Sequence, residues 1–313
     1  MEKRCTTFPG SDSSSDTGTS QAPDFSGGSD ETAPNDESTQ LQKRTLRKPP
    51  PLPLSVKRSH CDDSLRPNPP LVRFCQRGTP WQKYQRFIHE GSSTSYLAYE
   101  LSPAFPIVLI KKQHGVEAYS SKNLLRTSHT NLVNLRDAFI EGRQVFLVYE
   151  YMQLSLEQVH SSTSLKEFHI ATVCKEILQG IAYIHRELQI THGSINCQNV
   201  FVSFTGRIKI GDIGGSMLSG SKDNPEIDTQ SVGFVMREIM EPGHSYLNPK
   251  TFTLDKPEKW SLELLEFFEK TKNSTGTDLL NHVFLAYSPG PGCLGPPAVS
   301  AGRLSKREWK PFG

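Results

Sequence analysis

The stretch that decides the fold is Ile190-Thr191-His192-Gly193-Ser194-Ile195-Asn196-Cys197-Gln198-Asn199-Val200, a polar loop between two regular patterns. Before it, residues 165–188 repeat apolar side chains at the i, i+3, i+4 spacing of an amphipathic helix. After it, residues 200–202 and 208–210 are short β-rich runs, which predict a hairpin closed around 203–206. The chain therefore places a helix, a polar loop and a hairpin in direct succession.

The segments on either side of this loop differ in texture. Upstream, 107–110 is a short apolar strand, and 134–149 predicts two strands joined by a turn at 141–144. Downstream, helical patterns lie around 228–240, 261–270 and 277–285. A strand-rich front half and a helix-rich back half, with a crossing near Glu150, predict two lobes with a cleft between them.

Both ends of the chain differ from this central part. Residues 1–80 hold 11 of the 22 prolines, first in an acidic and then in a basic stretch that is also rich in serine. Such a sequence buries too little apolar area to offset the entropy of ordering the backbone, so we expect a disordered tail. The folded part is then 81–287, with an N-lobe at 81–149 and a C-lobe at 150–287. The Gly/Pro-rich residues 288–313 predict a flexible C-terminal tail.

Composition excludes several classes of protein. With 35 Lys+Arg against 33 Asp+Glu the net charge is only +2, which argues against a nucleic-acid binder. The six cysteines form no C-x-x-C pair, so their spacing indicates neither a zinc module nor a disulfide scaffold. No apolar run is long enough to cross a membrane, and the first residues lack the apolar core of a signal peptide. We therefore expect a cytoplasmic protein.

One motif stands out in the N-terminal tail. Arg47-Lys48-Pro49-Pro50-Pro51-Leu52-Pro53 is a basic residue followed by a P-x-x-P spacing, formed by Pro50 and Pro53. Such a run favours the polyproline II helix that SH3 domains bind, and the alternative is a stiff linker. Pairs of basic residues near it could form a nuclear address, although solvated tail charge is the simpler interpretation: Lys43-Arg44, Arg47-Lys48 and Lys57-Arg58.

The central loop resembles the catalytic loop of PAK-like, STE-group protein kinases. Ile208-Lys209-Ile210-Gly211-Asp212-Ile213-Gly214 is similar to their metal-binding D-F-G segment, and further motifs follow in the family's order. These are Val108-Leu109-Ile110-Lys111 for V-A-I-K, Glu150-Tyr151-Met152 for the hinge, Asp228–Gly233 for D-x-W-S-L-G, and 278–285 for the closing helix. The resemblance implies an α+β, two-lobed protein-kinase-like fold, with a small β-rich N-lobe and a larger helical C-lobe. Only 15 residues separate Asp212 from Asp228, so the activation segment is expected to be truncated.

Part of the kinase machinery is present in this sequence. The resemblance implies that Lys111 would contact ATP phosphates and that Asn199 and Asp212 would hold magnesium. Gly91 is the one glycine kept from the phosphate-covering loop. The remaining nucleotide-contacting positions match Leu109, Glu150, Met152 and Phe201.

The catalytic groups themselves are replaced. Ser194 stands where a kinase has its catalytic aspartate, and a hydroxyl cannot act as a base near neutral pH. Asn196 stands where the catalytic-loop lysine would be, and the family spacing places Ser120 where helix C offers a glutamate to Lys111, with Glu117 nearest. Leu109 and Phe201 are larger than the family's residues, which predicts a closed adenine pocket.

Three hypotheses follow from this pattern. The first is a catalytically inactive kinase-like protein, a pseudokinase, that works as a regulatory or scaffolding module for protein partners and needs no cofactor. The second is an ATP-binding serine/threonine kinase with weak residual phosphotransfer and weak binding of ATP and magnesium. The third is a decaying paralogue that folds poorly, against which the intact periodicity of 170–184 argues.

Overall fold

The computed structural model describes residues 75–89, 94–116, 120–220, 224–242 and 253–304, and the backbone of 310–311. All of them belong to the compact unit Asp63–Gly313. The tail before residue 75, with its proline motif, and also Gly91 and Glu117 lie outside the described residues. Among the helices that are described, none has the length and apolar character needed to cross a membrane.

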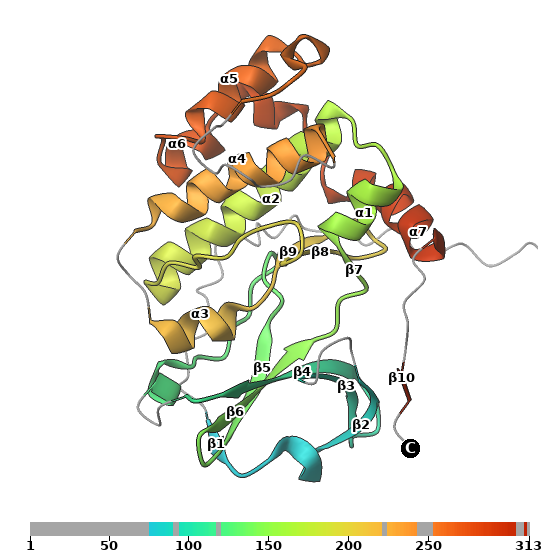
Figure 1. Ribbon diagram of the computed structural model, residues 1–313, viewed down its shortest axis with the longest axis vertical. Helices are drawn as coiled ribbons and strands as arrows, with labels where there is room; N and C mark the ends of the chain where they lie inside the picture. The colour runs from blue at the N-terminus through green and yellow to red at the C-terminus, as the bar shows by residue number, and fades with distance from the viewer. Residues whose placement is uncertain are drawn as a thin grey trace, which may run out of the picture. The chain divides into compact units, whose positions relative to one another are not determined.

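A seven-stranded sheet forms the N-lobe, in the order β1-β5-β6-β4-β3-β2-β10 (Figure 1). Its strands are β1 Gln76–Arg77, β2 Tyr84–His89, β3 Ser95–Glu100, β4 Ile107–His114, β5 Leu135–Glu141, β6 Gln144–Glu150 and β10 Lys310–Pro311. Neighbouring strands are antiparallel except β1, which runs parallel to β5. The expected strands at 107–110 and 134–149 are confirmed, and β1 shows that the fold begins before residue 81.

Alternation along β4 assigns its side chains to two faces. Val108 and Ile110 are fully buried in the core of the sheet with aromatic residues from four other strands, Tyr84, Tyr96, Phe139 and Phe146. Because successive side chains of a strand point to opposite faces, Leu109 and Lys111 project toward the other lobe. The pattern that builds the core of the N-lobe therefore also delivers the cleft-facing lysine.

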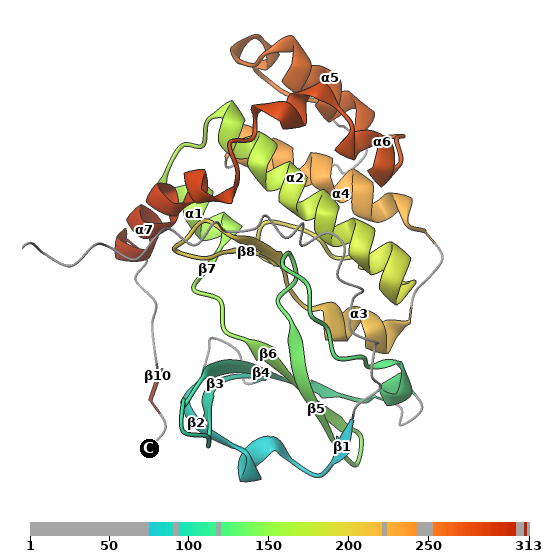
Figure 2. The same ribbon diagram turned by 180° about the vertical axis from the view of Figure 1, so that it is seen from behind.

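The C-lobe is built around helix α2, which has a small three-stranded sheet on one side (Figures 1 and 2). Its helices are α1 Leu156–Ser162, α2 Glu167–Tyr183, α4 Glu226–Met240, α5 Leu262–Lys270 and α6 Gly276–Leu280. Shorter turns are the N-lobe η2 Pro80–Gln82, and η4 Ile184–Leu188, η5 Pro257–Lys259 and η6 Val283–Tyr287. The small sheet has the order β7-β8-β9, from β7 Leu154–Ser155, β8 Val200–Val202 and β9 Ile208–Ile210. The β8–β9 hairpin forms as expected. The predicted apolar stripe of α2 is buried throughout and consists of Ile170, Val173, Cys174, Ile177, Leu178 and Ile181.

The expected truncation of the activation segment is confirmed. After Asp212 the chain forms one short helix, α3 Ile213–Ser219, which ends at Gly220 with φ 65°, and α4 begins at Glu226. Between β4 and β5 the described residues contain a single helical element, η3 Ser120–Asn123, and this turn packs on α3. Where a kinase would have helix C and an extended loop, this chain brings a 3-10 turn and a short helix together.

The prediction of a flexible tail from Ser288 is wrong for residues 288–304. They form η7 Pro291–Leu294 and α7 Gly295–Leu304, and α7 lies against α1 in both views (Figures 1 and 2). Leu294, Ala298 and Ala301 are fully buried. A Cβ at Gly206 in the β8–β9 turn would lie 1.9 Å from the carbonyl oxygen of Pro291. Small residues that suggest disorder in a sequence here permit close packing of the segment on the C-lobe.

Candidate functional site

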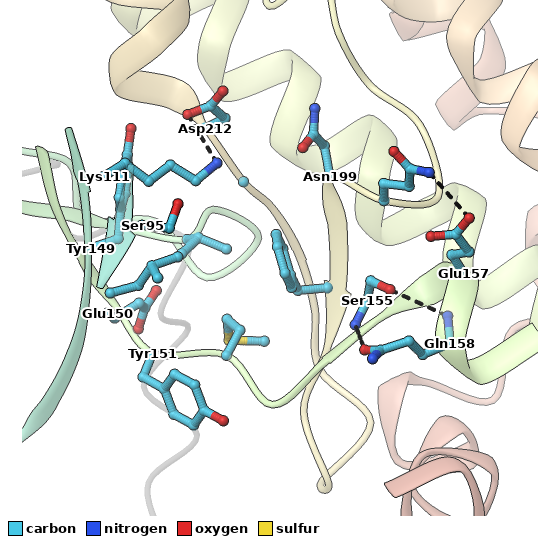
Figure 3. A pocket seen from close by; sticks show the side chains of 16 residues that line it. Ser95, Lys111, Tyr149, Glu150, Tyr151, Ser155, Glu157, Gln158, Asn199 and Asp212 are labelled. Atoms are coloured by element: carbon cyan, nitrogen blue, oxygen red, sulfur yellow. Dashed lines mark hydrogen bonds and ion pairs between the residues drawn. The ribbon is translucent and has the colours of Figure 1, made fainter. Parts of the chain in front are cut away.

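A cavity of about 650 Å³ lies between the two lobes (Figure 3). Every predicted cofactor or metal residue among the described ones lines it: Leu109, Lys111, Glu150, Met152, Asn199, Phe201 and Asp212. The residues that the resemblance singled out therefore lie together around one cavity. Further lining residues were missed by the sequence reasoning: Ser95, Tyr149, Ser155, Glu157 and Gln158.

The expectation of a closed pocket is wrong. A volume of about 650 Å³ falls in the range of small-molecule sites. Room exists because the ring of Phe201 lies against Gly211, where an added Cβ would be 2.5 Å from the ring. The bulk of Phe201 is thus taken up by the missing side chain of a neighbouring residue, a compensation that the residue-by-residue comparison did not consider.

Lys111 pairs with Asp212 across the cavity. Its Nζ lies 3.3 Å from Oδ1 of Asp212, and the two side chains point toward each other (Figure 3). Each is 28% exposed, so solvent screens this ion pair, and Oδ1 makes no aligned hydrogen bond within the described residues. The lysine therefore has a carboxylate partner, at the position that matches the metal-binding aspartate of the kinases. Ser120, the position where the family has its helix C glutamate, belongs to the 3-10 turn η3.

Tyr149 closes the rear of the site. It is buried at the end of β6, and its phenolic oxygen accepts a hydrogen bond from the amide of Gly214 at 3.0 Å. Burial, together with the negative charge of Asp212, raises the pKa of this phenol well above its ordinary value, so Tyr149 remains neutral. An added Cβ on Gly214 would lie 2.7 Å from the phenolic oxygen. The only sequence signal for this role was a large polar aromatic residue directly before the hinge.

The catalytic loop is held by a buried carboxylate. Asp228 has no exposed surface, and its oxygens accept the amides of His192 and Gly193, both at 2.8 Å. Its Oδ2 also lies 2.7 Å from Nε2 of His185. His192 in turn places Nε2 2.7 Å from the carbonyl oxygen of Gly211, and burial lowers the pKa of its ring. These contacts fix the backbone of the loop relative to the Asp212 segment.

Ser194 stands exposed at the tip of this fixed loop. Its Oγ lies 3.4 Å from Nδ1 of His192, a long contact, and its carbonyl oxygen accepts Nδ2 of Asn199 at 2.9 Å. Asn196 turns inward within the loop, where its Oδ1 accepts the amides of Gln198 and Asn199, both at 2.9 Å. The two asparagines therefore stabilise the loop conformation, and a hydroxyl occupies the position of the base.

Magnesium would find a suitable pair of residues here. Asp212 and Asn199 both line the cavity, and carboxylate and amide oxygens are ligands that this ion prefers. Since Nδ2 of Asn199 donates to the loop, its Oδ1 is the atom left for an ion. Glu150 is different: its Oε1 receives Lys209 at 2.5 Å and the amide of Asn134 at 2.8 Å, so its carboxylate is used in holding the hinge.

Comparison with known proteins agrees with this architecture. Residues 111–256 match the model of the protein kinase domain. The chain is 25% identical to serine/threonine-protein kinase STE20 of Candida glabrata over 291 residues, which is 76% of this chain and 32% of that protein. STE20 of Saccharomyces cerevisiae is 25% identical over 75% of the chain, and CST20 of Candida albicans likewise, with 30% and 23% of those proteins covered. The chain thus spans a third or less of the length of these relatives. It has a two-lobed protein-kinase-like fold that resembles the STE-group kinases.

Proposed function

We propose that the protein is a pseudokinase, a kinase-like module that regulates or scaffolds other proteins without transferring phosphate. The observation that carries this proposal is Ser194, a hydroxyl at the base position of a loop whose backbone is otherwise firmly held. Positioned general bases contribute about 10²–10⁴ to a rate, and serine cannot replace a carboxylate near neutral pH.

The segment after Asp212 supports the same proposal. A kinase positions its peptide substrate on the activation segment, and here α3 occupies most of the interval before α4. Ser216 on α3 donates its hydroxyl to the carbonyl oxygen of His192 at 2.9 Å, which ties the helix to the catalytic loop. This segment contributes to the packing of the C-lobe in place of presenting a substrate platform.

A phosphotransfer assay tests the proposal. The purified full chain is incubated with magnesium and γ-labelled ATP, alone and with a generic basic protein substrate, and we expect no label above background. The Asp212→Ala variant is the control, because it removes the carboxylate at the metal-binding position. Turnover by the wild-type protein that disappears in this variant would refute the pseudokinase.

A second candidate function is favoured by the open cavity. With about 650 Å³ between the lobes, and with Lys111, Asn199 and Asp212 on its wall, an ATP-binding kinase of weak residual activity remains an alternative. Lys111 would contact the phosphates, Asn199 and Asp212 would hold the ion, and magnesium, when bound, supplies positive charge that neutralises the phosphates. Lys111 would have to exchange part of its contact with Asp212 for the nucleotide.

Thermal denaturation separates the two candidates. A ligand at 100 times its dissociation constant stabilises a protein by about 2.7 kcal/mol, which is easily measured. If the protein binds no nucleotide, as the pseudokinase proposal expects, Mg-ATP leaves its melting temperature unchanged. A rise that Lys111→Ala abolishes would show a working nucleotide site, and phosphotransfer would then decide whether it is an enzyme.

Protein partners are part of the proposal. An SH3 domain would bind through Arg47, Pro50 and Pro53, which lie outside the described residues. If so, capture by an SH3 domain is lost in the Pro50→Ala/Pro53→Ala variant and kept in Pro34→Ala. Unchanged capture would remove this partner class.

We propose a cytoplasmic location, with a nuclear one through the basic pairs around Arg47 as the alternative. Microscopy of the tagged full chain decides between them. Nuclear signal that is lost when Lys43 and Arg44 become alanine would favour the nuclear address.

A further inference from the structure

Three side chains that can ligate a metal converge inside the C-lobe, away from the cavity between the lobes. They are His160 near the end of α1, Cys197 in the catalytic loop, and Glu238 in α4. One ligand atom from each lies within 4.8 Å of the other two, and Nε2 of His160 lies 3.4 Å from Oε1 of Glu238. Their positions in the sequence are far apart, so no sequence motif predicts the cluster.

Three polar atoms of this cluster lack hydrogen bonds, whereas the thiol of Cys197 lies 4.0 Å from the carbonyl oxygen of Val235 and contacts Glu238. His160 is 7% exposed, and within the described part of the chain neither of its ring nitrogens has a hydrogen-bond partner; the same holds for Oε2 of Glu238. The 3.4 Å approach of His160 to Glu238 is close enough for an ion pair but is not an aligned hydrogen bond. A buried polar atom without a partner costs about 1–3 kcal/mol, and such groups commonly mark an ion or water.

We propose that His160, Cys197 and Glu238 bind one zinc ion. Zn²⁺ takes imidazole, thiolate and carboxylate ligands at about 2.0–2.3 Å, so that neighbouring ligand atoms in a tetrahedral site lie roughly 3.5 Å apart. The present separations need only small side-chain movements to reach this arrangement. A thiolate and a carboxylate also balance the two charges of the ion, which a site this buried requires.

Three protein ligands would leave the fourth position of the ion to water. Of the three, His160 lines a surface cavity of about 680 Å³, together with Ser161, Thr163 and Trp260, from which an ion could approach. Three protein ligands and one water are the arrangement of an open zinc site.

The thiol of Cys197 must lose its proton when it binds zinc. Burial is the main cause, and the carboxylate of Glu238 the second, that raises the pKa of this cysteine, so the metal-free protein carries a protonated thiol. Zinc binding forms the Zn–S bond and releases that proton to solvent. Once formed, the site links α1 and α4 to the segment between Asn196 and Asn199, so the ion would hold the catalytic loop in place.

Metal content of the full chain is the first test. The protein is purified, loaded with Zn²⁺ alone, dialysed and measured by inductively coupled plasma mass spectrometry, with an expected result of one zinc per chain. Cys197→Ser and Glu238→Gln are expected to reduce bound zinc to the buffer level. Cys75→Ser, which changes a half-buried cysteine outside the cluster, keeps the full amount.

Cobalt substitution keeps the test decisive if a variant fails to fold. Wild-type protein loaded with Co²⁺ should show a thiolate-to-cobalt charge-transfer absorption, which Cys75→Ser retains. A wild-type protein without this absorption, or zinc retained equally in a folded Cys197→Ser variant, would overturn the proposal. Zinc retained in that way would point to residues such as His60 and Cys61.

Discussion

The phenolic oxygen of Tyr149 accepts the amide of Gly214 at 3.0 Å and leaves no space there for a side chain. This contact joins the end of strand β6 to the first turn of α3. It fixes the backbone directly after Asp212, which pairs with Lys111. One hydroxyl therefore helps to set the geometry around Asp212.

Tyr149→Phe should destabilise the protein without changing its packing volume. The ring remains, but the amide of Gly214 loses its acceptor in a buried position, which costs about 1–3 kcal/mol. Urea denaturation measures the free energy of unfolding, and hydrogen exchange should become faster at residues 213–219. Exchange and stability equal to those of the wild type would show that the contact contributes nothing.

Gly214→Ala should cost about 1–3 kcal/mol through overpacking. Its Cβ would lie 2.7 Å from the phenolic oxygen of Tyr149 and 3.1 Å from Cδ1 of Leu147. Combined with Tyr149→Phe, part of this cost should disappear, because the closest atom is then absent. A double-mutant cycle checks this coupling, and strictly additive losses would contradict it.

Asp228→Asn should lower stability by about 3 kcal/mol. The buried carboxylate receives the amides of His192 and Gly193 and contacts His185, and an asparagine would turn a donor toward donors. Asp278→Asn, at an exposed carboxylate beside Thr275 at the start of α6, is the matched control, with an expected loss below about 1 kcal/mol. Equal losses in the two variants would show that Asp228 does not anchor the loop.

His192 should make stability fall in mild acid. Burial lowers the pKa of this ring in the folded state, so the unfolded chain takes up the proton first. Stability is therefore unaffected by this group above about pH 6.5 and is lost as the pH falls below that value, at up to about 1.4 kcal/mol per pH unit. His192→Gln keeps a donor for Gly211 but cannot titrate, so its unfolding free energy should depend less steeply on pH between 7 and 5. An unchanged slope would exclude His192 as a source of the acid sensitivity.

Local patterns predicted the fold well. The helical stripe of α2 and the β8–β9 hairpin follow from periodicities that are complete within a few residues, and alternation in β4 places Lys111 in the cleft. The family resemblance supplied the order of the lobes and the position of the cavity. Local patterns predict well because they involve residues close together in the sequence. The resemblance predicts well because the motifs follow the same order along the chain as in the kinase family.

The features that the sequence did not predict depend on contacts between residues that are not adjacent in the sequence. Tyr149 and Gly214 are 65 residues apart, and the cluster of His160, Cys197 and Glu238 unites three separate elements. The cavity stays open because Gly211 compensates for Phe201, a pairing visible only in space. Composition failed for α7, since glycine and proline content alone does not distinguish a mobile segment from one that packs closely.

The packing of α7 decides which truncations of this protein can fold. A Cβ added at Gly302 in α7 would lie 2.7 Å from the ring of Phe204. Helix α7 also contacts α1 and β7. An expression boundary chosen after residue 287, the end of the C-lobe that the sequence predicted, would remove α7 and expose the apolar surface that it covers. A premature stop codon at the same place would have the same effect. Its product should aggregate or be degraded, although it still contains every residue that lines the cavity between the lobes.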